Sequence, residues 1–536
     1  MSRIIGIDLG TTNTCTAFVS NKIPRVIPTE SGFNTMPSVV TFHPDGTVLV
    51  GQAAKEQMLT YPERTLHGIK RLLGRQGSSR TVQELRGYFS YKIVTGEKGL
   101  AAVEVGGKIH TCDEIQSHIL KQIRRYAEIN LGEDIPDVVI AVPAYYSDQQ
   151  RALVKRAGSL AGWNVKRIVN EPTAAALAYG FNRGFDQKIL IYDLGGGTFD
   201  VSILEITGNV FQVVASGGDM FLGGSDFDAR IQDWILDMLR KQYKVELDDD
   251  PAALQRVRSA AERAKIELSL LANTEIRLPA LVERRGKSID VNMVLDRDTL
   301  NSLTEDLVGR TISVIDRLLE DCHIGKHEIE EVIPVGGQTR MPLVVDAITS
   351  HFNRSPRKGI HPDECVALGA ALLGDSLAKI DAVTLLDTLS VPLGVSDRNG
   401  KLKVLIDRNV RLPHKASMDI ATQTDNQTVL ELDVYQGESE IPVQSAEYLG
   451  TLIYADIPPA PATTVKVNIE MLLDAEGMLS ITASNNQSGA PKKITLTTVE
   501  RPTNDDSLEE RRGPGVVPPE PSSGLKGLVR SLWSKK

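Results

Sequence analysis

Two stretches of the 536-residue chain carry aspartate, glycine and threonine in the same order. The first reads IIGIDLGTTNTCTAFV over residues 4–19, and the second reads KILIYDLGGGTFDVSILEI over residues 188–206. In each, an apolar strand reaches an Asp-Leu-Gly turn and a second apolar strand follows. Glycine at the tip is typical of a β-hairpin, because it adopts positive φ at little steric cost. The repeat therefore predicts two similar lobes.

These residue types suit a nucleotide triphosphate, which needs backbone N–H groups at close range and a metal held by carboxylates through water. Asp8 and Asp193 end the two strands and are the expected ligands of hydrated Mg²⁺. The two expected phosphate cradles are Gly10, Thr11, Thr12 and Asn13, and Gly195, Gly196, Gly197 and Thr198. One such turn alone equally fits an ordinary hairpin tip with a capping aspartate. Two copies favour the phosphate site.

Neither of two common nucleotide motifs is present. The sequence has no GxxxxGK[ST], and no GxGxxG opens a helix. The expected phosphate site is therefore built from hairpins.

Other patterns organise the rest of the chain. A third glycine turn lies in EVIPVGGQTRMP, and residues 113–130 and 255–271 have helical spacing of apolar residues. Strands and helices in this order indicate an α/β architecture. From 393 to about 500, short alternating segments separated by turns predict an antiparallel sandwich.

Composition excludes several classes of protein. The formal net charge of -9 argues against nucleic acid as a partner, because phosphate contacts need a basic face. The four cysteines form no CxxC pair, and no apolar run is long enough to span a membrane. The N-terminal stretch is too short in apolar residues for a signal peptide, so we expect a cytoplasmic protein.

The last segment, 501–536, is rich in proline, glycine, serine and charge, which favours disorder. It ends in GLKGLVRSLWSKK, whose apolar residues share one helical face with basic residues around it. Weak contact with a membrane surface or a partner is one interpretation. A frayed solubilising tail is the other, because 13 residues make a marginal helix.

Many ordered strings resemble the heat-shock protein 70 family of DnaK-like chaperones. They span residues 2 to about 500 and are GIDLGTTN, IKRLLGR, VPAYYSDQQR, RIVNEPTAAALAYG, YDLGGGTFDVSIL, FLGGSDFD, ERAKIELS, VGGQTRMP, VTLLD, and DNQ followed by IPPAP. The resemblance implies an actin-like ATPase with a two-lobed, duplicated ribonuclease H-like core over 1–380, a linker over 381–392 and a β-sandwich peptide-binding domain over 393–500.

The resemblance also implies roles for single residues. Lys70 matches the catalytic lysine, and Glu171 and Thr198 match groups near the γ-phosphate. Asp193 is a further expected catalytic residue, and Pro143 and Arg151 match a relay to the surface. Electrostatic stabilisation by such groups is the main tool of phosphoryl transfer. The implied nucleotide contacts are Gly223, Gly224, Glu262, Lys265, Ser269, Gly336, Gly337, Gln338 and Arg340. The implied cofactors are ATP or ADP and Mg²⁺, with K⁺ a further candidate.

Partners follow from the same resemblance: extended or unfolded polypeptide, a J-domain co-chaperone and a nucleotide-exchange factor. Arg167, Asn170 and the linker Val383–Asp387 resemble the J-domain region, with Thr384 in place of a usual leucine.

The sequence departs from the family in its peptide-binding part. Only 36 residues follow Glu500, so the family's helical lid is expected to be missing, and Ala462 replaces the arginine that latches it. The expected peptide-binding positions are Arg398 and Gln423 in the arch and Leu430 in the central pocket. Each differs from the small or apolar residue of the family, and a larger Leu430 should narrow the pocket.

Three functions remain open. The first is an ATP-dependent chaperone that releases polypeptide when ATP closes the lobes. The second is a nucleotide-switched scaffold for one dedicated partner. The third is a small-molecule kinase of the same superfamily, which the linker and the sandwich disfavour.

Overall fold

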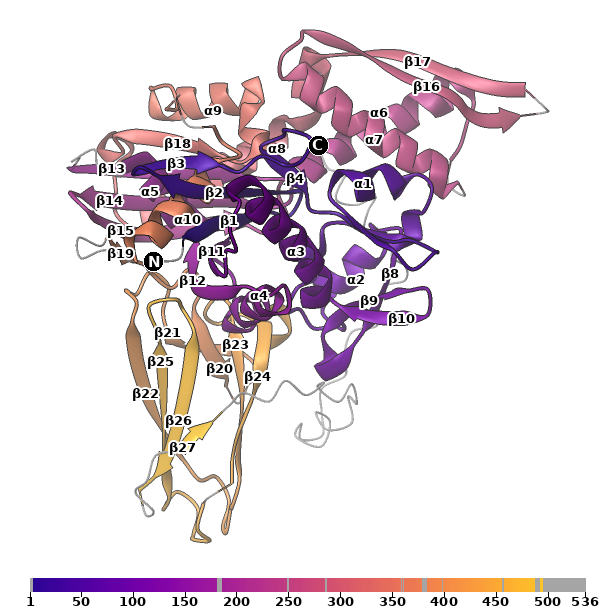
Figure 1. Ribbon diagram of the computed structural model, residues 1–536. Helices are drawn as coiled ribbons and strands as arrows, with labels where there is room; N and C mark the ends of the chain where they lie inside the picture. Colours follow the sequence, from indigo (N-terminus) through magenta and orange to yellow (C-terminus); the bar gives the residue numbers. More distant parts are fainter. Residues whose placement is uncertain are drawn as a thin grey trace. The chain divides into compact units, whose positions relative to one another are not determined.

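The structure is a computed structural model (Figure 1). It describes residues 3–180, 186–247, 250–284, 287–357, 359, 361–377, 383–397, 399–455, 457–486 and 492–494. All of these belong to one compact unit, residues 1–498. The tail 501–536 and Arg398, both named above, lie outside the described residues.

The first lobe is built on a sheet with the order β12-β11-β1-β2-β3 and with β4 beside β2. Strand β1 pairs antiparallel with β2 and parallel with β11, so the predicted first hairpin is confirmed. The strands are β1 (Ile4–Leu9), β2 (Asn13–Ser20), β3 (Ile23–Val26), β4 (Thr35–Pro37), β11 (Asp137–Val142) and β12 (Asn164–Asn170).

The second lobe repeats this pattern in the order β18-β13-β14-β15-β19. Strand β13 pairs antiparallel with β14 and parallel with β18, which confirms the second hairpin and the duplication. The strands are β13 (Asp186–Leu194), β14 (Phe199–Thr207), β15 (Val210–Asp219), β18 (Glu331–Val335) and β19 (Thr384–Leu386).

Two apolar helices, α5 (Glu171–Gly180) and α10 (Cys365–Ser376), lie between the sheets (Figure 1). Their glycines allow backbone contact: a Cβ on Gly369 would stand 1.7 Å from the Ala174 carbonyl oxygen. Because these helices are buried on nearly every side, they lack the polar face of a surface helix. They fix the distance between the lobes.

Smaller elements extend the first lobe. They are β5 (Val40–Phe42), β6 (Val48–Val50), α1 (Gln52–Lys55), η1 (Glu56–Met58), η2 (Pro62–Arg64), β7 (Thr65–Leu66), η3 (Ile69–Arg71), α2 (Arg80–Arg86), β8 (Lys92–Thr95), η4 (Glu97–Gly99), β9 (Ala101–Val105), β10 (Lys108–Thr111), α3 (Cys112–Leu131) and α4 (Asp148–Leu160). Helix α3 starts at a capping box between Thr111 and Glu114, which satisfies N–H groups of its first turn. Its apolar face joins the first-lobe core.

The second lobe carries its own additions. They are α6 (Gly224–Met238), η5 (Leu239–Tyr243), α7 (Pro251–Leu268), β16 (Asn273–Arg284), β17 (Lys287–Asp296), α8 (Arg297–Asp321), η6 (Lys326–Glu328), η7 (Gly337–Arg340) and α9 (Pro342–Phe352). Strands β16 and β17 form a long hairpin beside α6 and α7 (Figure 1).

Residues from 393 form two four-stranded antiparallel sheets, β21-β20-β23-β24 and β22-β25-β26-β27, so the predicted sandwich is confirmed. Side chains of β25 alternate between core and solvent, as expected for strands with one buried face. The elements are β20 (Leu393–Ser396), β21 (Leu402–Ile406), β22 (His414–Ala421), β23 (Leu430–Gln436), η8 (Val443–Ser445), β24 (Glu447–Tyr454), β25 (Lys466–Leu473), β26 (Leu479–Asn485) and β27 (Lys492–Ile494). We call this part the β-domain.

Candidate active site

The two glycine turns meet at one cavity of about 100 Å³. Most of the residues expected at the nucleotide and its metal line it: Asp8, Gly10, Thr11, Thr12, Asn13, Lys70, Glu171, Asp193, Gly195, Gly196, Thr198, Gly336 and Gly337. They come from hairpin tips of both lobes, from η3, from the start of α5 and from the turn after β18. The fold therefore brings together residues that are hundreds of positions apart.

Close backbone approach explains the glycines of these turns. A Cβ on Gly196 would lie 2.0 Å from Thr12 Oγ1, which belongs to the opposite lobe. A Cβ on Gly336, whose φ is +81°, would lie 2.4 Å from the Leu194 carbonyl oxygen. Larger residues at these positions would push the lobes and turns apart.

A buried ion pair lies at the base of the cavity. Lys70 Nζ is 2.6 Å from Glu171 Oε1. Burial opposes the charge of Lys70, but attraction to Glu171, Tyr146 and Asp8 raises the pKa of its ammonium group. Lys70 is therefore a fixed positive charge in a dry site, where electrostatic interactions are strong.

Carboxylates outnumber the cations at this site. Burial, and then repulsion by Glu171, raises the pKa of both Asp8 and Asp200 to about 7. The same causes, in the same order, raise the pKa of Asp193 well above its usual value. A divalent cation would supply the missing positive charge, so these residues fit Mg²⁺.

The described residues contain no group of three or more His, Cys, Asp or Glu placed to hold a metal ion. This is compatible with an ion that keeps its waters and meets Asp8 and Asp193 through them, because Mg²⁺ gives up water reluctantly.

A second cavity, of about 160 Å³, shares Thr11, Thr12 and Gly196 with the first. Three further residues expected to contact the nucleotide line it: Gly224, Glu262 and Lys265. Helix α7 places the last two on one face, and Lys55 of the first lobe lies 3.4 Å from Glu262 of the second. The cavity is therefore bounded by both lobes.

Lys265 is tied to the wall of this cavity. Its Nζ donates to the Gly224 carbonyl at 2.8 Å and lies 2.9 Å from Asp228 Oδ1. Burial raises the pKa of Asp228, against the attraction of Lys265.

Five of the expected nucleotide contacts are not among the residues that line the two cavities: Gly197, Gly223, Ser269, Gln338 and Arg340. A Cβ on Gly223 would meet the Gly197 backbone at 2.4 Å. Ser269 Oγ donates to the Lys265 carbonyl at 3.4 Å.

Gln338 and Arg340 follow the third glycine turn, in η7. Gln338 Oε1 lies 3.2 Å from where a Cβ on Gly224 would stand. Arg340 pairs with Asp363 at 2.7 Å.

Sequence reasoning missed several residues of the site. Asp363 lines the first cavity. Asp200, in β14, is close enough to Glu171 and Lys70 of that cavity to interact with both charges. Asp228 and Arg258 line the second. Asp200 directly follows the glycine turn in GGGTFD, and that adjacency is a signal that could have found it. Asp228 ends the string FLGGSDFD, so the resemblance to the family could have pointed to it, whereas Asp363 and Arg258 lie on elements whose local pattern is that of any turn or helix.

The linker forms a strand of the second-lobe sheet. Strand β19 pairs in parallel with Val210–Gln212 of β15. Just beyond it, Asp387 Oδ2 accepts a hydrogen bond from Thr173 Oγ1 at 3.0 Å. Burial raises the pKa of Asp387, against the backbone hydrogen bond from Thr388 and the attraction of Arg151.

The two residues expected to form a relay, Pro143 and Arg151, lie in the first lobe, after β11 and on α4. Pro143 is buried directly after β11, and its carbonyl accepts from the Tyr146 N–H at 3.1 Å. Arg151 is 5% exposed and donates to Asn170 Oδ1 at 2.7 Å. Arg151, Arg167, Asn170, Leu385 and Asp387 line one small cavity with Leu412, Ala475 and Glu476 of the β-domain. The expected J-domain residues therefore do lie beside the linker.

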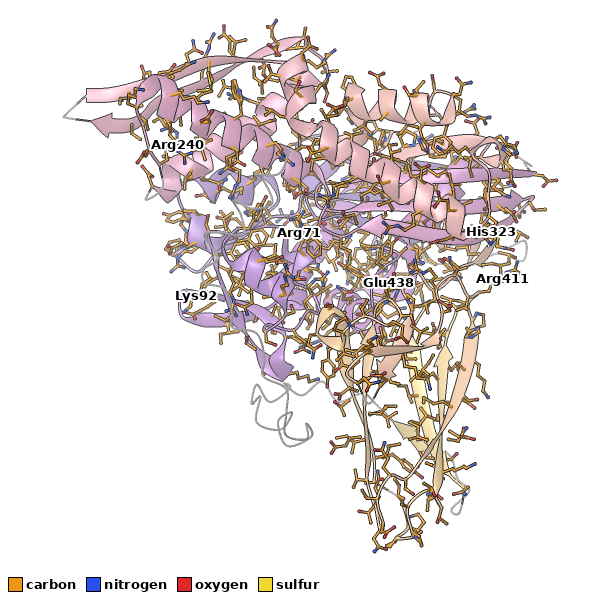
Figure 2. The ribbon with its side chains drawn as sticks, turned by 180° about the vertical axis from the view of Figure 1, so that it is seen from behind. Arg71, Lys92, Arg240, His323, Arg411 and Glu438 are labelled. Carbon is orange, nitrogen blue, oxygen red and sulfur yellow. The ribbon has the colours of Figure 1, made fainter. Side chains whose placement is uncertain are left out.

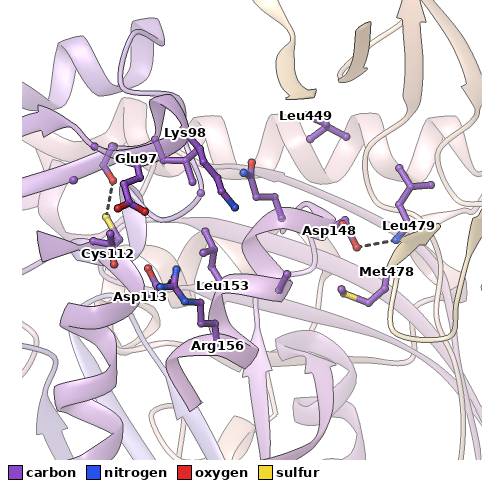
Figure 3. A pocket seen from close by; sticks show the side chains of 18 of the residues that line it. Glu97, Lys98, Cys112, Asp113, Asp148, Leu153, Arg156, Leu449, Met478 and Leu479 are labelled. Atoms are coloured by element: carbon purple, nitrogen blue, oxygen red, sulfur yellow. Dashed lines mark hydrogen bonds and ion pairs between the residues drawn. The ribbon is translucent and has the colours of Figure 1, made fainter. Parts of the chain in front are cut away.

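Helix α4 contacts the β-domain directly. The Leu479 N–H donates to Asp148 Oδ1 at 2.8 Å, as Figure 3 shows, and Lys155 lies 2.5 Å from Glu476. Burial raises the pKa of Asp148, against that hydrogen bond. A cavity of about 780 Å³ lies alongside, between α3, α4 and strand β26 (Figure 3).

Within the β-domain, Leu430 is 6% exposed and belongs to the sandwich core, at the start of β23. The Gln423 N–H donates to Gln427 Oε1 at 2.7 Å. Their roles in peptide binding stay predictions. No helix of the described chain has both the length and the apolar character needed to cross a membrane.

Together, the duplicated lobes, the cavities between them and the appended sandwich define a two-lobed α/β protein with a linked β-domain. A model of the Hsp70 protein family matches residues 4–513, which is most of the chain. The chain belongs to the Hsp70 family. Membership implies an actin-like ATPase joined to a β-sandwich domain, and family members bind ATP and ADP with Mg²⁺ and act as ATP-dependent chaperones.

Proposed function

We propose that this protein hydrolyses ATP in the crevice between its lobes and uses the nucleotide state to gate binding of extended polypeptide by the β-domain. One observation carries the proposal: the linker is a strand of the lobe that holds half of the phosphate site. A change at the nucleotide can therefore reach the β-domain through a hydrogen-bonded sheet.

The hydrolytic step needs little covalent chemistry from the protein. Lys70 would orient the attacking water and stabilise the charge of the transferring phosphoryl group, and the ion pair with Glu171 would hold its ammonium group in position. Backbone N–H groups of the two glycine turns would bind the phosphates, and Asp8 and Asp193 would hold the Mg²⁺ waters. Bound Mg²⁺ would neutralise phosphate charge.

Gating follows from contacts that depend on lobe closure. With ATP bound, the closed lobes present Asn170, Thr173 and Arg151 to the linker and to Glu476. The β-domain then docks and releases polypeptide, and hydrolysis reverses the change. Gating of this kind uses only contacts among the described residues and requires no helical lid.

Pairing of a bound strand with a sheet edge would supply affinity independent of peptide sequence. If Leu430 lies at the central pocket, as its position in the sequence predicts, its size would favour short or small side chains at the centre of the bound segment. A J-domain protein would contact the region of Arg167 and Asn170, and a nucleotide-exchange factor would assist release of ADP. Both partners belong to the proposal.

Fluorescence anisotropy of a labelled extended peptide, titrated with full-length protein in ADP and then in ATP, tests the gating. We expect the affinity to be lower in ATP. Equal affinity in the two nucleotides would contradict gating, and absence of ATP hydrolysis in the same samples would contradict the ATPase assignment.

A scaffold that serves one dedicated partner is the second candidate. The size of Leu430 at the expected central pocket position favours it, because a narrow pocket would limit the range of peptides. A peptide array separates the two: a broad apolar preference supports the chaperone, and one avid sequence supports the scaffold.

A further inference from the structure

Arg75 joins three parts of the molecule at one buried guanidinium group. The residue is 7% exposed and follows the segment of η3 that carries Lys70. Its Nε donates to the Arg71 carbonyl at 3.0 Å, its Nη2 lies 3.6 Å from Met220 Sδ, and its Nη1 donates to Glu447 Oε2 at 3.2 Å. These partners belong to the first lobe, the second lobe and the β-domain, respectively.

Arg71 (labelled in Figure 2) connects Arg75 to the expected phosphate site. Arg71 Nη2 donates to the Gly197 carbonyl at 2.8 Å, and Gly197 is part of the second glycine turn. The same guanidinium lies 3.9 Å from Asp226 at the start of α6. Arg71 of the first lobe therefore holds the phosphate turn of the second lobe.

The fit at this contact is tight. A Cβ on Gly197 would lie 2.6 Å from Arg71 Nε. Any opening of the lobes that moves the second glycine turn must therefore lengthen or break the Arg71 contact, and it also withdraws Met220 from Arg75.

On the other side, Glu447 is the first residue of β24, an edge strand of the β-domain. Two residues later, Leu449 lines the large cavity together with Gly74, which precedes Arg75. Further along β24, Thr451 Oγ1 donates to Asp433 Oδ1 of β23 at 2.6 Å. The position of Glu447 is thus tied to that of its sheet.

A buried guanidinium without its carboxylate is costly, so the pair favours states in which both groups are in place. Both are in place when the lobes are closed and β24 is docked. The linker and Arg151 reach the β-domain elsewhere, at Leu412 and at the Asp474–Gly477 turn.

We infer that Arg75 is a positioning residue that couples closure of the lobes on nucleotide to docking of β24 through Glu447. This is a second route, separate from the linker, and it rests on the proposed gating function. In this role Arg75 does not contact the nucleotide or take part in the hydrolytic step. Its effect is on the difference between the peptide affinities in ATP and ADP.

Three variants of the full-length protein test the inference: Glu447→Gln, Glu447→Arg, and the charge swap Arg75→Glu with Glu447→Arg. Peptide anisotropy is measured in ADP and in ATP. We expect Glu447→Gln to lower the peptide Kd in ATP by about two- to fivefold, toward the ADP value, as expected for loss of a partly exposed ion pair. Glu447→Arg should lower it by about tenfold, because two like charges then face each other.

The swap should restore part of the ATP value, because it rebuilds the ion pair but not the donation from residue 75 to the Arg71 carbonyl. The peptide Kd in ADP should stay unchanged in every variant, which a merely destabilised β-domain would not show. Glu431→Gln is the matched control, since Glu431 is an exposed carboxylate on the neighbouring strand β23. It should behave as wild type.

Two outcomes overturn the inference. One is an unchanged ATP value in both single variants. The other is a swap whose ATP value is no closer to wild type than that of Glu447→Arg although its peptide Kd in ADP is that of wild type. If wild-type protein itself shows no difference between ATP and ADP, the proposed gating fails first and the coupling role falls with it.

Discussion

The Nζ atom of Lys70 and the Oε1 atom of Glu171 lie 2.6 Å apart, and both side chains are less than one tenth exposed. Lys70 is positioned by the short helix η3, and Glu171 by the first turn of α5, which lies between the two sheets. The pair therefore links the wall of the crevice to the helix layer between the lobes.

Replacement of Lys70 by alanine should lower kcat for ATP hydrolysis by about 10²- to 10³-fold, because a fixed positive charge is lost from the phosphoryl site. Binding of ADP, measured by calorimetry, should change by less than about threefold, because the glycine turns remain. Lys92→Ala, at an exposed lysine on β8, is the control. Wild-type hydrolysis by Lys70→Ala would refute the catalytic role.

Loss of Lys70 also leaves Glu171 buried without its partner, which destabilises the fold. The double variant Lys70→Ala with Glu171→Gln removes that unpaired charge. It should recover stability in urea unfolding while remaining inactive, so loss of activity can be separated from loss of structure.

Asp200 should make the nucleotide-free and metal-free protein less stable as pH rises. Burial raises its pKa from the ordinary value of 3.8 to about 7 in the folded chain. Between pH 3.8 and pH 7 the folded state therefore keeps a proton on Asp200 that the unfolded state has lost. Its contribution to the free energy of unfolding must then fall through this window. Asp200→Asn should therefore gain stability over wild type as pH rises, by up to about 4 kcal/mol at pH 8, at about 1.36 kcal/mol for each pKa unit.

Urea unfolding at pH steps from about 4.5 to 8 measures this difference. Asp346→Asn, at an exposed aspartate on α9, is the control for loss of a carboxylate at the surface. A difference between Asp200→Asn and wild type that does not vary with pH would contradict the role assigned to burial.

Gly223→Ala should weaken nucleotide binding by about tenfold or more, because overpacking costs about 1–3 kcal/mol. The added Cβ would stand 2.4–2.6 Å from the Gly197 backbone and would displace the second glycine turn. Calorimetry with ADP and Mg²⁺ measures the loss. Gly309→Ala serves as the control: Gly309 lies on α8 with no atom near the added Cβ, so binding should be unchanged and stability should rise by about 1 kcal/mol.

Asp387→Asn should weaken docking of the linker. The substitution removes the charge from the hydrogen bond with Thr173 and from the neighbourhood of Arg151. Charge-assisted hydrogen bonds are roughly twice as strong as neutral ones, so the ratio of peptide Kd in ATP to that in ADP should fall about fivefold. Anisotropy measures the ratio, and a variant with the wild-type ratio would show that Asp387 does not hold the linker.

Much of the fold could be predicted from local patterns. Both hairpins, the position of Asp8 and Asp193 at strand ends and the alternation in the sandwich depend on neighbours within a few residues, and the structure has all three. The likeness of the two turns also placed Thr12 and Gly196 in one site, and they do line the same cavity.

The sequence by itself determined which residue types stand at the turns, because turn geometry and strand periodicity are local properties of the backbone. Only the tertiary structure decided which carboxylates crowd around Lys70, how β19 pairs with β15, and that Arg75 meets Glu447, 372 residues further along the chain. The physical reason is that burial and pairing energies depend on the groups that packing brings together, and no short window of sequence contains both partners.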